Sequence, residues 1–183
     1  MFRAKLSVVC ACLLAIGASI LTGCSTNPVD RTAGMSPNSL YSEAKDEMTQ
    51  GQWDKAVPLL EKLEAKAAGT PLAQQAQLDK AYAHYKSGEA AQALATLDRF
   101  VKIHPASPAM DYALYLKGII NFNGDLGLFS TITRQDLAER DQKASKESFE
   151  AFKELVTRFP DSQYSPDARQ RMIFLRNRLA DYE

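Results

Sequence analysis

The stretch PLAQQAQLDKAYAHYKSGEAAQALATLDRFVKIHP, residues 71–105, carries the clearest indication of the fold. Its apolar residues recur at intervals of three and four, which predicts two amphipathic helices and no strand. Ser87-Gly88 predicts the turn between the helices, and Pro105 predicts the end of the second one. The apolar stripes are Leu78, Ala81, Tyr82 and Tyr85 in the first helix, and Ala90, Ala93, Leu94, Leu97, Phe100 and Val101 in the second.

The same helix–turn–helix order recurs before and after this stretch. A Ser/Thr-Pro pair precedes each unit, where the hydroxyl can cap the helix and proline fits the first helical position. The prolines are 34, 37 and 58 residues apart, so the third unit carries an insertion. A seventh helix is expected from Pro166. The four pairs are Ser36-Pro37, Thr70-Pro71, Ser107-Pro108 and Ser165-Pro166.

The spacing resembles the tetratricopeptide repeat, which has a small residue at the helix crossing, a turn glycine, a second small residue and a closing proline. Ala81, Gly88, Ala93 and Pro105 stand at these places. We therefore expect an all-α solenoid over residues 37–183, with about three helix pairs and one further helix. A helical bundle with accidental spacing is the alternative, but the caps, turns and small residues keep one phase.

The N-terminus predicts a lipoprotein. Two basic residues precede an uncharged apolar run that ends at Leu21, shorter than the roughly 20 residues a membrane span needs. We therefore predict a signal peptide over residues 1–23. The motif Leu21-Thr22-Gly23-Cys24 resembles the bacterial lipobox, which implies cleavage before Cys24 and attachment of diacylglycerol and an N-acyl chain to it. An ordinary secretory signal is the alternative, but residues 25–183 hold no second cysteine.

Residues 24–36 are small and polar and lack apolar periodicity, which predicts a flexible tether. Ser25 follows the lipidated residue, and in lipoproteins serine at this place implies the outer membrane. Two of the 22 basic residues lie in the signal peptide, leaving 20 against 22 acidic ones. This balance gives no reason to expect nucleic-acid binding.

Motifs for chemistry are missing from the sequence. The two histidines, His84 and His104, fall in different predicted helices without metal-ligand spacing. No nucleophile motif and no phosphate loop occurs. We expect no enzyme activity, no metal and no cofactor apart from the covalent lipid.

Short motifs throughout residues 38–183 resemble the BamD family, the lipoproteins of the outer-membrane β-barrel assembly machinery. The resemblance implies a lipid-anchored scaffold and recognition subunit on the periplasmic face of the outer membrane. It implies partner subunits including BamA, and ligands that are the C-terminal targeting peptides of unfolded outer-membrane proteins. The motifs are Leu40-Tyr41-Ser42-Glu43-Ala44, Gln77-Leu78-Asp79, Ala81-Tyr82-Ala83-His84-Tyr85-Lys86, Leu97-Asp98-Arg99-Phe100, Met110-Asp111-Tyr112-Ala113-Leu114-Tyr115 and Phe159-Pro160-Asp161-Ser162-Gln163-Tyr164.

The sequence departs from this family in two ways. Residues 65–71, AKAAGTP, replace the usual aromatic-proline pair at the end of the first unit. The family also continues for two further helix pairs that dock BamA, so we expect a truncated or short form here.

The first helices of a tetratricopeptide solenoid line its concave face. This placement predicts a peptide-binding groove, because tyrosine rings offer apolar area and keep a polar tip. A lysine could meet a terminal carboxylate. The alternative is that these aromatic residues are core. The predicted groove residues are Tyr41, Tyr82, Tyr85, Tyr112 and Tyr115, with Ile119 and Phe122 near them and Lys45 and Lys86 beside them.

The insertion, residues 123–143, is expected to form an ordered loop over the edge of this groove, or else a solvated excursion.

Two other functions compete with the assembly role. One is a periplasmic tetratricopeptide adaptor for cell-wall synthesis or division proteins, although such proteins usually lack a lipobox. The other is a lipoprotein that binds a small ligand, for which no apolar run suggests a pocket.

Overall fold

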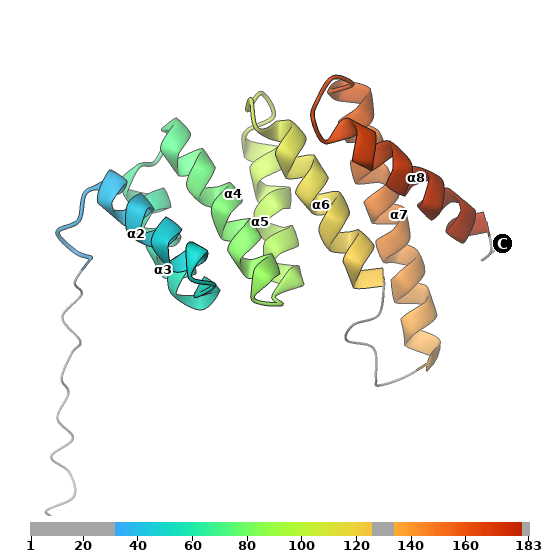
Figure 1. Cartoon of the computed structure of the whole chain (residues 1–183), viewed down its shortest axis with the longest axis horizontal. Coiled ribbons are helices and arrows are strands. Elements are labelled where there is room, and N and C mark those ends of the chain that lie inside the picture. The colour runs from blue at the N-terminus through green and yellow to red at the C-terminus, as the bar shows by residue number, and fades with distance from the viewer. Residues whose placement is uncertain (1–31, 126–133, 181–183) are drawn as a thin grey trace, which may run out of the picture. The chain divides into compact units, whose positions relative to one another are not determined.

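The computed structural model of the chain describes residues 32–125 and 134–180. Within these ranges it describes the backbone alone for residues 124–125 and 134–141, and side chains elsewhere. The predicted signal peptide, Cys24 and most of the predicted tether lie outside these ranges. All regular secondary structure within them is helical (Figure 1). The helices are α2 (Pro37–Thr49), α3 (Trp53–Lys66), α4 (Pro71–Lys86), α5 (Ala90–Ile103), α6 (Met110–Asp125), α7 (Arg134–Arg158) and α8 (Ser165–Ala180).

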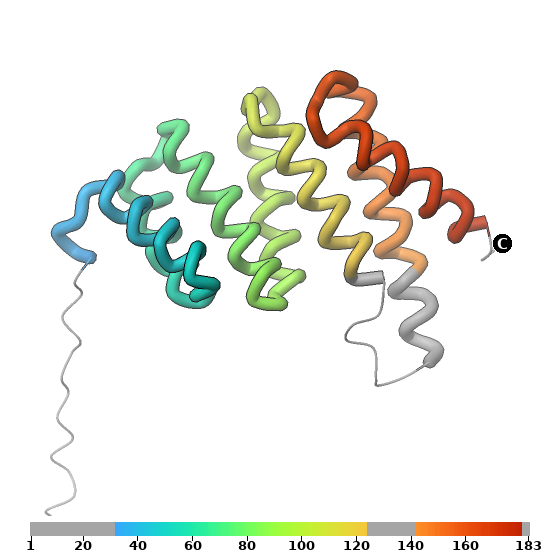
Figure 2. The backbone as a smooth tube through the Cα atoms, in the orientation of Figure 1, coloured from blue at the N-terminus to red at the C-terminus, as the bar shows by residue number. Residues whose placement is uncertain are grey.

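The helices belong to one unit of the chain, Gly34–Glu183, and each packs against the helix that follows it. The backbone trace reverses direction at every turn (Figure 2). The first helices of successive pairs also meet, because α4 contacts α6. This order confirms the all-α, tetratricopeptide-like fold predicted from the sequence. None of the described helices is long and apolar enough to cross a bilayer.

Two of the four Ser/Thr-Pro pairs cap helices as predicted. The hydroxyl oxygens of Ser36 and Thr70 accept hydrogen bonds from backbone N–H groups three residues on, and proline follows at the first helical position. The other two pairs differ. Helix α6 begins only at Met110, two residues after Pro108. Ser165 already lies in α8 and donates its hydroxyl to the carbonyl of Phe159 at 2.7 Å.

The turns inside the first two pairs depend on glycine. Gly51 and Gly88 have φ angles of 73° and 85°, which residues with a Cβ rarely adopt. At each turn the glycine N–H and the next N–H bond back to carbonyls of the preceding helix, as in a Schellman motif. The glycines therefore end α2 and α4 and reverse the chain.

The core follows the predicted stripes in two clusters, one around Leu60 and Leu63 and the other around Phe100 and Phe152. Tyr82 packs against both. Helices α6 and α7 approach closely at Gly118, because a Cβ there would overlap the ring of Phe152. The Ser148 hydroxyl donates to the Gly118 carbonyl at 2.9 Å, which satisfies a buried oxygen at the same contact.

The prediction of a loop over residues 123–143 is wrong at both ends. Helix α6 continues to Asp125, and α7 already begins at Arg134. The charged run from Arg134 to Lys143 therefore extends α7 to 25 residues. Residues 126–133, the middle of the insertion, lie outside the described ranges.

Candidate functional site

The five predicted groove tyrosines come from the first helices of three successive pairs, and all are half-buried. Tyr41 lies on α2, Tyr82 and Tyr85 on α4, and Tyr112 and Tyr115 on α6. We call these five residues the tyrosine face. Side-chain contacts link this face from α2 through α4 and α6 to α8, and they show how its rings and hydroxyls are held.

Asp79 lies where the tyrosine face passes from α2 to α4. Its side chain is only 9% exposed, and Oδ2 lies 3.6 Å from Nζ of Lys45. Gln75 donates to the other carboxylate oxygen at 3.0 Å. Burial of the Tyr41 phenol, together with the nearby Asp79 carboxylate, raises the pKa of Tyr41 to about 12. Tyr41 therefore stays neutral beside a buried negative charge.

Tyr82 is positioned by an aromatic contact from the first repeat. The ring of Trp53, the first residue of α3, meets Tyr82 edge to face with centroids 5.7 Å apart. Nζ of Lys86 lies 5.8 Å from the centroid of Trp53, within cation–π range. Lys86 is exposed, so its charge is presented at the edge of the face.

Tyr112 and Tyr115 pack against Tyr164, which precedes α8. Tyr115 stacks on Tyr164 with centroids 4.7 Å apart and planes at 18°, and Tyr112 lies 5.7 Å from the same ring. Burial is the main cause that raises the pKa of Tyr112, and the charge of Asp79 adds to it. Asp79 therefore influences phenols on both sides of α4.

The hydroxyl of Tyr115 donates to Oδ2 of Asp167 on α8 at 2.9 Å, and Nε of Arg171 donates to the same oxygen at 2.6 Å. Burial alone would raise the pKa of Asp167, but these two hydrogen bonds and the arginine charge lower it. The pKa of Tyr115 is raised, first by burial and then by Asp167. The far end of the tyrosine face thus carries a second ionised carboxylate.

Tyr85 is held by the end of α6, because Nδ2 of Asn123 donates to its hydroxyl oxygen. Phe122, predicted to lie near the groove, is instead packed against α8. Its ring lies 5.5 Å from that of Phe174, and the Arg171 guanidinium carbon lies 4.7 Å from its centroid. Ile119 is half-buried against the core.

The sequence interpretation missed Asp79, Tyr164 and Asp167. A signal for Asp79 was present, because it stands three residues before Tyr82 and so falls on the same helical stripe. Tyr164 and Asp167 had no comparable signal, since their contacts join α8 to residues about 50 positions earlier.

The tyrosine face offers ring surfaces and two carboxylates, and the hydroxyls of Tyr85 and Tyr115 are hydrogen-bonded to protein groups. Such a surface can bind but provides no activated nucleophile. Among the described residues no cluster of three or more histidine, cysteine or carboxylate side chains could hold a metal ion.

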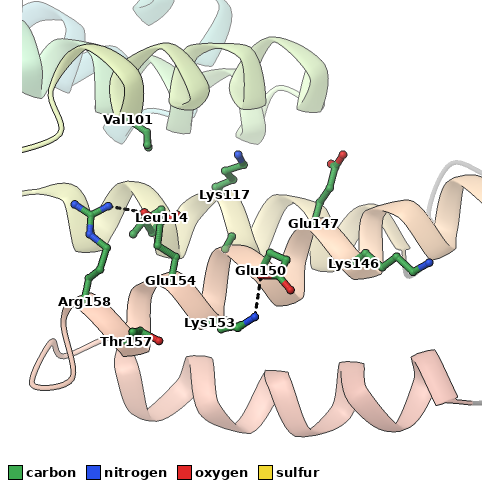
Figure 3. Close-up of a pocket in the computed structure, with 11 residues that line it drawn as sticks. Val101, Leu114, Lys117, Lys146, Glu147, Glu150, Lys153, Glu154, Thr157 and Arg158 are labelled. Atoms are coloured by element: carbon green, nitrogen blue, oxygen red, sulfur yellow. Dashed lines mark hydrogen bonds and ion pairs between the residues drawn. The ribbon is translucent and has the colours of Figure 1, made fainter.

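Two grooves lie away from the tyrosine face. One of about 530 Å³ lies between α5, α6 and α7, and its apolar lining includes Val101, Leu114 and Ala151 (Figure 3). Ion pairs within α7, such as Glu150 with Lys153, line it. The other, of about 460 Å³, lies along α3, α4 and α5 around Glu64.

Glu64 is held by three partners. Gln77 and Lys80 donate to it at 2.7 Å and 2.8 Å, and Arg99 lies 3.2 Å away. Burial would raise the pKa of Glu64, but these hydrogen bonds and positive charges lower it. The cluster joins α3, α4 and α5 and so has a structural role.

Comparison with known proteins gives a consistent result. Residues 33–183 match the family YfiO, described as an outer membrane lipoprotein. A protein of Neisseria meningitidis serogroup B, named outer membrane protein assembly factor BamD, is 44% identical over 93% of this chain and 64% of its own length. Proteins of the same name from Vibrio cholerae and Haemophilus influenzae are 38% and 32% identical, over 92% and 93% of this chain and 69% and 64% of their own lengths. The chain therefore spans somewhat less than two thirds of the Neisseria relative.

Proposed function

The chain belongs to the YfiO family of outer membrane lipoproteins, and we propose that it acts in outer-membrane protein assembly by holding extended segments of unfolded outer-membrane proteins on the tyrosine face. As a member of this family it is a lipid-anchored protein of the outer membrane. Its relatives are named as assembly factors, which supports the assembly role.

One observation carries the choice of site. Five half-buried tyrosines stand on three successive first helices, where Trp53 contacts Tyr82 and Tyr164 packs against both Tyr112 and Tyr115. A row of rings suits an extended chain, because each ring gives a large apolar contact at low entropy cost. The ligands we propose are the C-terminal targeting peptides of outer-membrane proteins, which tend to end in an aromatic residue.

Lys86 is the residue we propose for the terminal carboxylate of such a peptide. It is exposed, and Trp53 holds its ammonium group beside Tyr82. Lys45 is less suitable, because it already lies near the Asp79 carboxylate, which would repel an anion.

A peptide-binding experiment tests the site. A fluorescein-labelled decapeptide that ends in phenylalanine is titrated with the protein and followed by anisotropy. Replacing both Tyr82 and Tyr115 with alanine is expected to weaken binding at least about tenfold, since each loses a ring contact of about 1 kcal/mol or more. Phe149→Ala is the matched control, because Phe149 is a half-buried aromatic residue of α7 outside the face. Unchanged affinity in a folded double variant would rule the site out.

The anchor we propose is Cys24, which would carry diacylglycerol on its sulfur and an acyl chain on its amine. Several acyl chains bind stably to a bilayer where one chain holds only marginally. Cys24→Ser is expected to move the protein from the membrane fraction to the soluble periplasm, whereas Cys12→Ser should leave it in the membrane. Retention of the Cys24→Ser protein in a washed outer-membrane fraction would contradict this assignment.

We also propose that the chain associates with the subunits of the β-barrel assembly machinery, BamA among them. Affinity purification from detergent-treated envelopes, with partners identified by mass spectrometry, tests this association. Recovery of the assembly subunits supports it. Recovery of cell-wall synthases in their place would favour the adaptor function.

A further inference from the structure

We infer that Asp79 forms a subsite for a cationic side chain, lysine or arginine, of a peptide bound on the tyrosine face. The subsite lies where α2, α4 and α6 meet, and its walls are Tyr41, Tyr82 and Tyr112. This inference rests on the proposed peptide-binding function and adds a charge preference to it.

The Asp79 carboxylate is buried and has few close partners. Asp79 is only 7% exposed, and no close hydrogen-bond donor meets Oδ2 among the described residues, although the phenol of Tyr41 also interacts with the carboxylate. Gln75 donates a hydrogen bond to the other oxygen, Oδ1, and the ammonium of Lys45 lies 3.6 Å from Oδ2. A buried carboxylate oxygen without a donor is costly to a fold. Oδ2 is itself closed to solvent, so a cationic donor from a ligand reaches it only by taking the place of Lys45.

Tyrosine side chains from three helices lie near Asp79. The charge of Asp79 acts on the phenols of Tyr41 on one side and Tyr112 on the other, so both lie close to it. Tyr82 follows three residues later on the same face of α4 and contacts Trp53. Aromatic faces attract an ammonium or guanidinium group through their quadrupoles. A carboxylate among three tyrosine rings is thus chemically suited to a basic side chain.

Lys45 lies beside the subsite in the free protein. Its side chain is 45% exposed, and its contact with Asp79 is longer than a hydrogen bond. Only the Lys45 end of this ion pair is accessible, so the buried Asp79 carboxylate loses little when Lys45 leaves only if another cation takes its place. A peptide cation can displace it, because the long side chain of Lys45 can turn into solvent at little cost.

A paired set of peptides tests the subsite. Each labelled decapeptide ends in phenylalanine and carries a single lysine at one internal position, and its partner carries norleucine there. For the wild-type protein we expect one lysine position to bind about tenfold more tightly than its norleucine partner, as charge-assisted hydrogen bonds are the stronger kind. Asp79→Asn should reduce the ratio of lysine-peptide to norleucine-peptide affinity to about one, whatever its effect on the absolute affinity of the norleucine peptide.

Two further variants complete the design. Lys45→Met removes the competing cation and should increase affinity for the preferred lysine peptide alone, and it keeps the Asp79 carboxylate in place. Asp98→Asn, at an exposed carboxylate on α5, is the matched control and should change nothing.

The outcomes separate the two ideas. If every norleucine peptide binds as tightly as its lysine partner, the cation subsite is overturned while the peptide-binding function stands. If no peptide of either kind binds, the proposed function itself fails, and the subsite with it. A lysine preference that persists in folded Asp79→Asn would assign the cation to another group and overturn the inference.

Discussion

The hydroxyl of Tyr115 donates a hydrogen bond to Oδ2 of Asp167, 52 positions later in the chain, at 2.9 Å. This bond joins α6 to α8 and holds the last part of the tyrosine face. Tyr115→Phe removes the hydroxyl and keeps the ring, so we expect a loss of about 1 kcal/mol in the free energy of unfolding. A double-mutant cycle with Asp167→Asn, measured by urea denaturation, isolates the interaction. Additive effects of the two substitutions would show that the bond contributes nothing.

The contact between α6 and α7 predicts a strong effect at Gly118. In Gly118→Ala the new methyl group would overlap the buried ring of Phe152, so we expect a loss of about 1–3 kcal/mol. Combining it with Phe152→Leu should recover part of the loss of Gly118→Ala. Gly34→Ala is the matched control, because a Cβ at Gly34 meets no atom within 4 Å and its φ is not positive. Equal stability of the two glycine variants would contradict the close approach.

We expect Glu64 to contribute a part of the free energy of unfolding that is lost at acidic pH. Because its pKa is lowered in the folded protein, its contribution is present above the pKa of the unfolded chain and is lost as the pH falls through the folded value. Glu64→Gln should cost about 1–3 kcal/mol at pH 7, and the difference from wild type should shrink below about pH 4.

Urea denaturation at a series of pH values from 7 to 3 measures this dependence. Glu61→Gln, an exposed position on the same helix α3, is the control and should follow the wild-type curve. A constant gap between Glu64→Gln and wild type over this range would show that the carboxylate is not the source.

We expect Tyr41 to contribute a part of the free energy of unfolding that is lost at alkaline pH. Its pKa is raised to about 12, so folding favours the neutral phenol. This contribution is complete below about pH 10, the pKa of an unfolded tyrosine, and is lost as the pH rises toward 12. Stability should therefore fall less steeply above pH 10 in Tyr41→Phe than in wild type. Circular dichroism during urea titrations at pH 9, 10 and 11 gives the slopes, and identical slopes would refute the shift.

We expect α4 to lose stability when its N-terminal cap, Thr70, is removed. Thr70 accepts a hydrogen bond from the N–H of Ala73 at 3.2 Å and also donates to the carbonyl of Ala67 at 2.6 Å. Thr70→Ala should lower the unfolding free energy by about 1 kcal/mol. Thr96→Ala, which removes a hydroxyl from inside α5, should cost much less, because that hydroxyl only bonds back to the carbonyl of Gln92 within its own helix. Comparable losses at both positions would argue against a capping role.

Most of the fold could be predicted because its signals are local. Helical periodicity, the caps at Ser36 and Thr70 and the turn glycines Gly51 and Gly88 each act within a few residues. The predicted cap of α8 and the predicted loop before α7 were wrong, because context outside the local pattern determines both. The hydroxyl of Ser165 bonds to the Phe159 carbonyl and does not cap α8, and the charged run after Arg134 continues α7 because nothing in it stops a helix.

The candidate site could be predicted only in its tyrosines. Their stripe is visible in the sequence, but the partners of their hydroxyl groups come from distant elements. Asp167 reaches Tyr115 from α8, and Asn123 reaches Tyr85 from the end of α6. Such long-range pairs depend on how the repeats stack, which the periodicity of one helix does not specify.

We expect the tyrosine face to contact unfolded outer-membrane proteins in the cell envelope. Site-specific photocrosslinking tests it most directly, with a photoreactive phenylalanine analogue placed at Tyr82 or Tyr112. Ala95, exposed on α5, is the control position. We predict ultraviolet-dependent crosslinks from Tyr82 and Tyr112 to newly made outer-membrane proteins, and none from Ala95. Crosslinks from Ala95 alone, or from none of the three positions in a correctly localised protein, would contradict the claim.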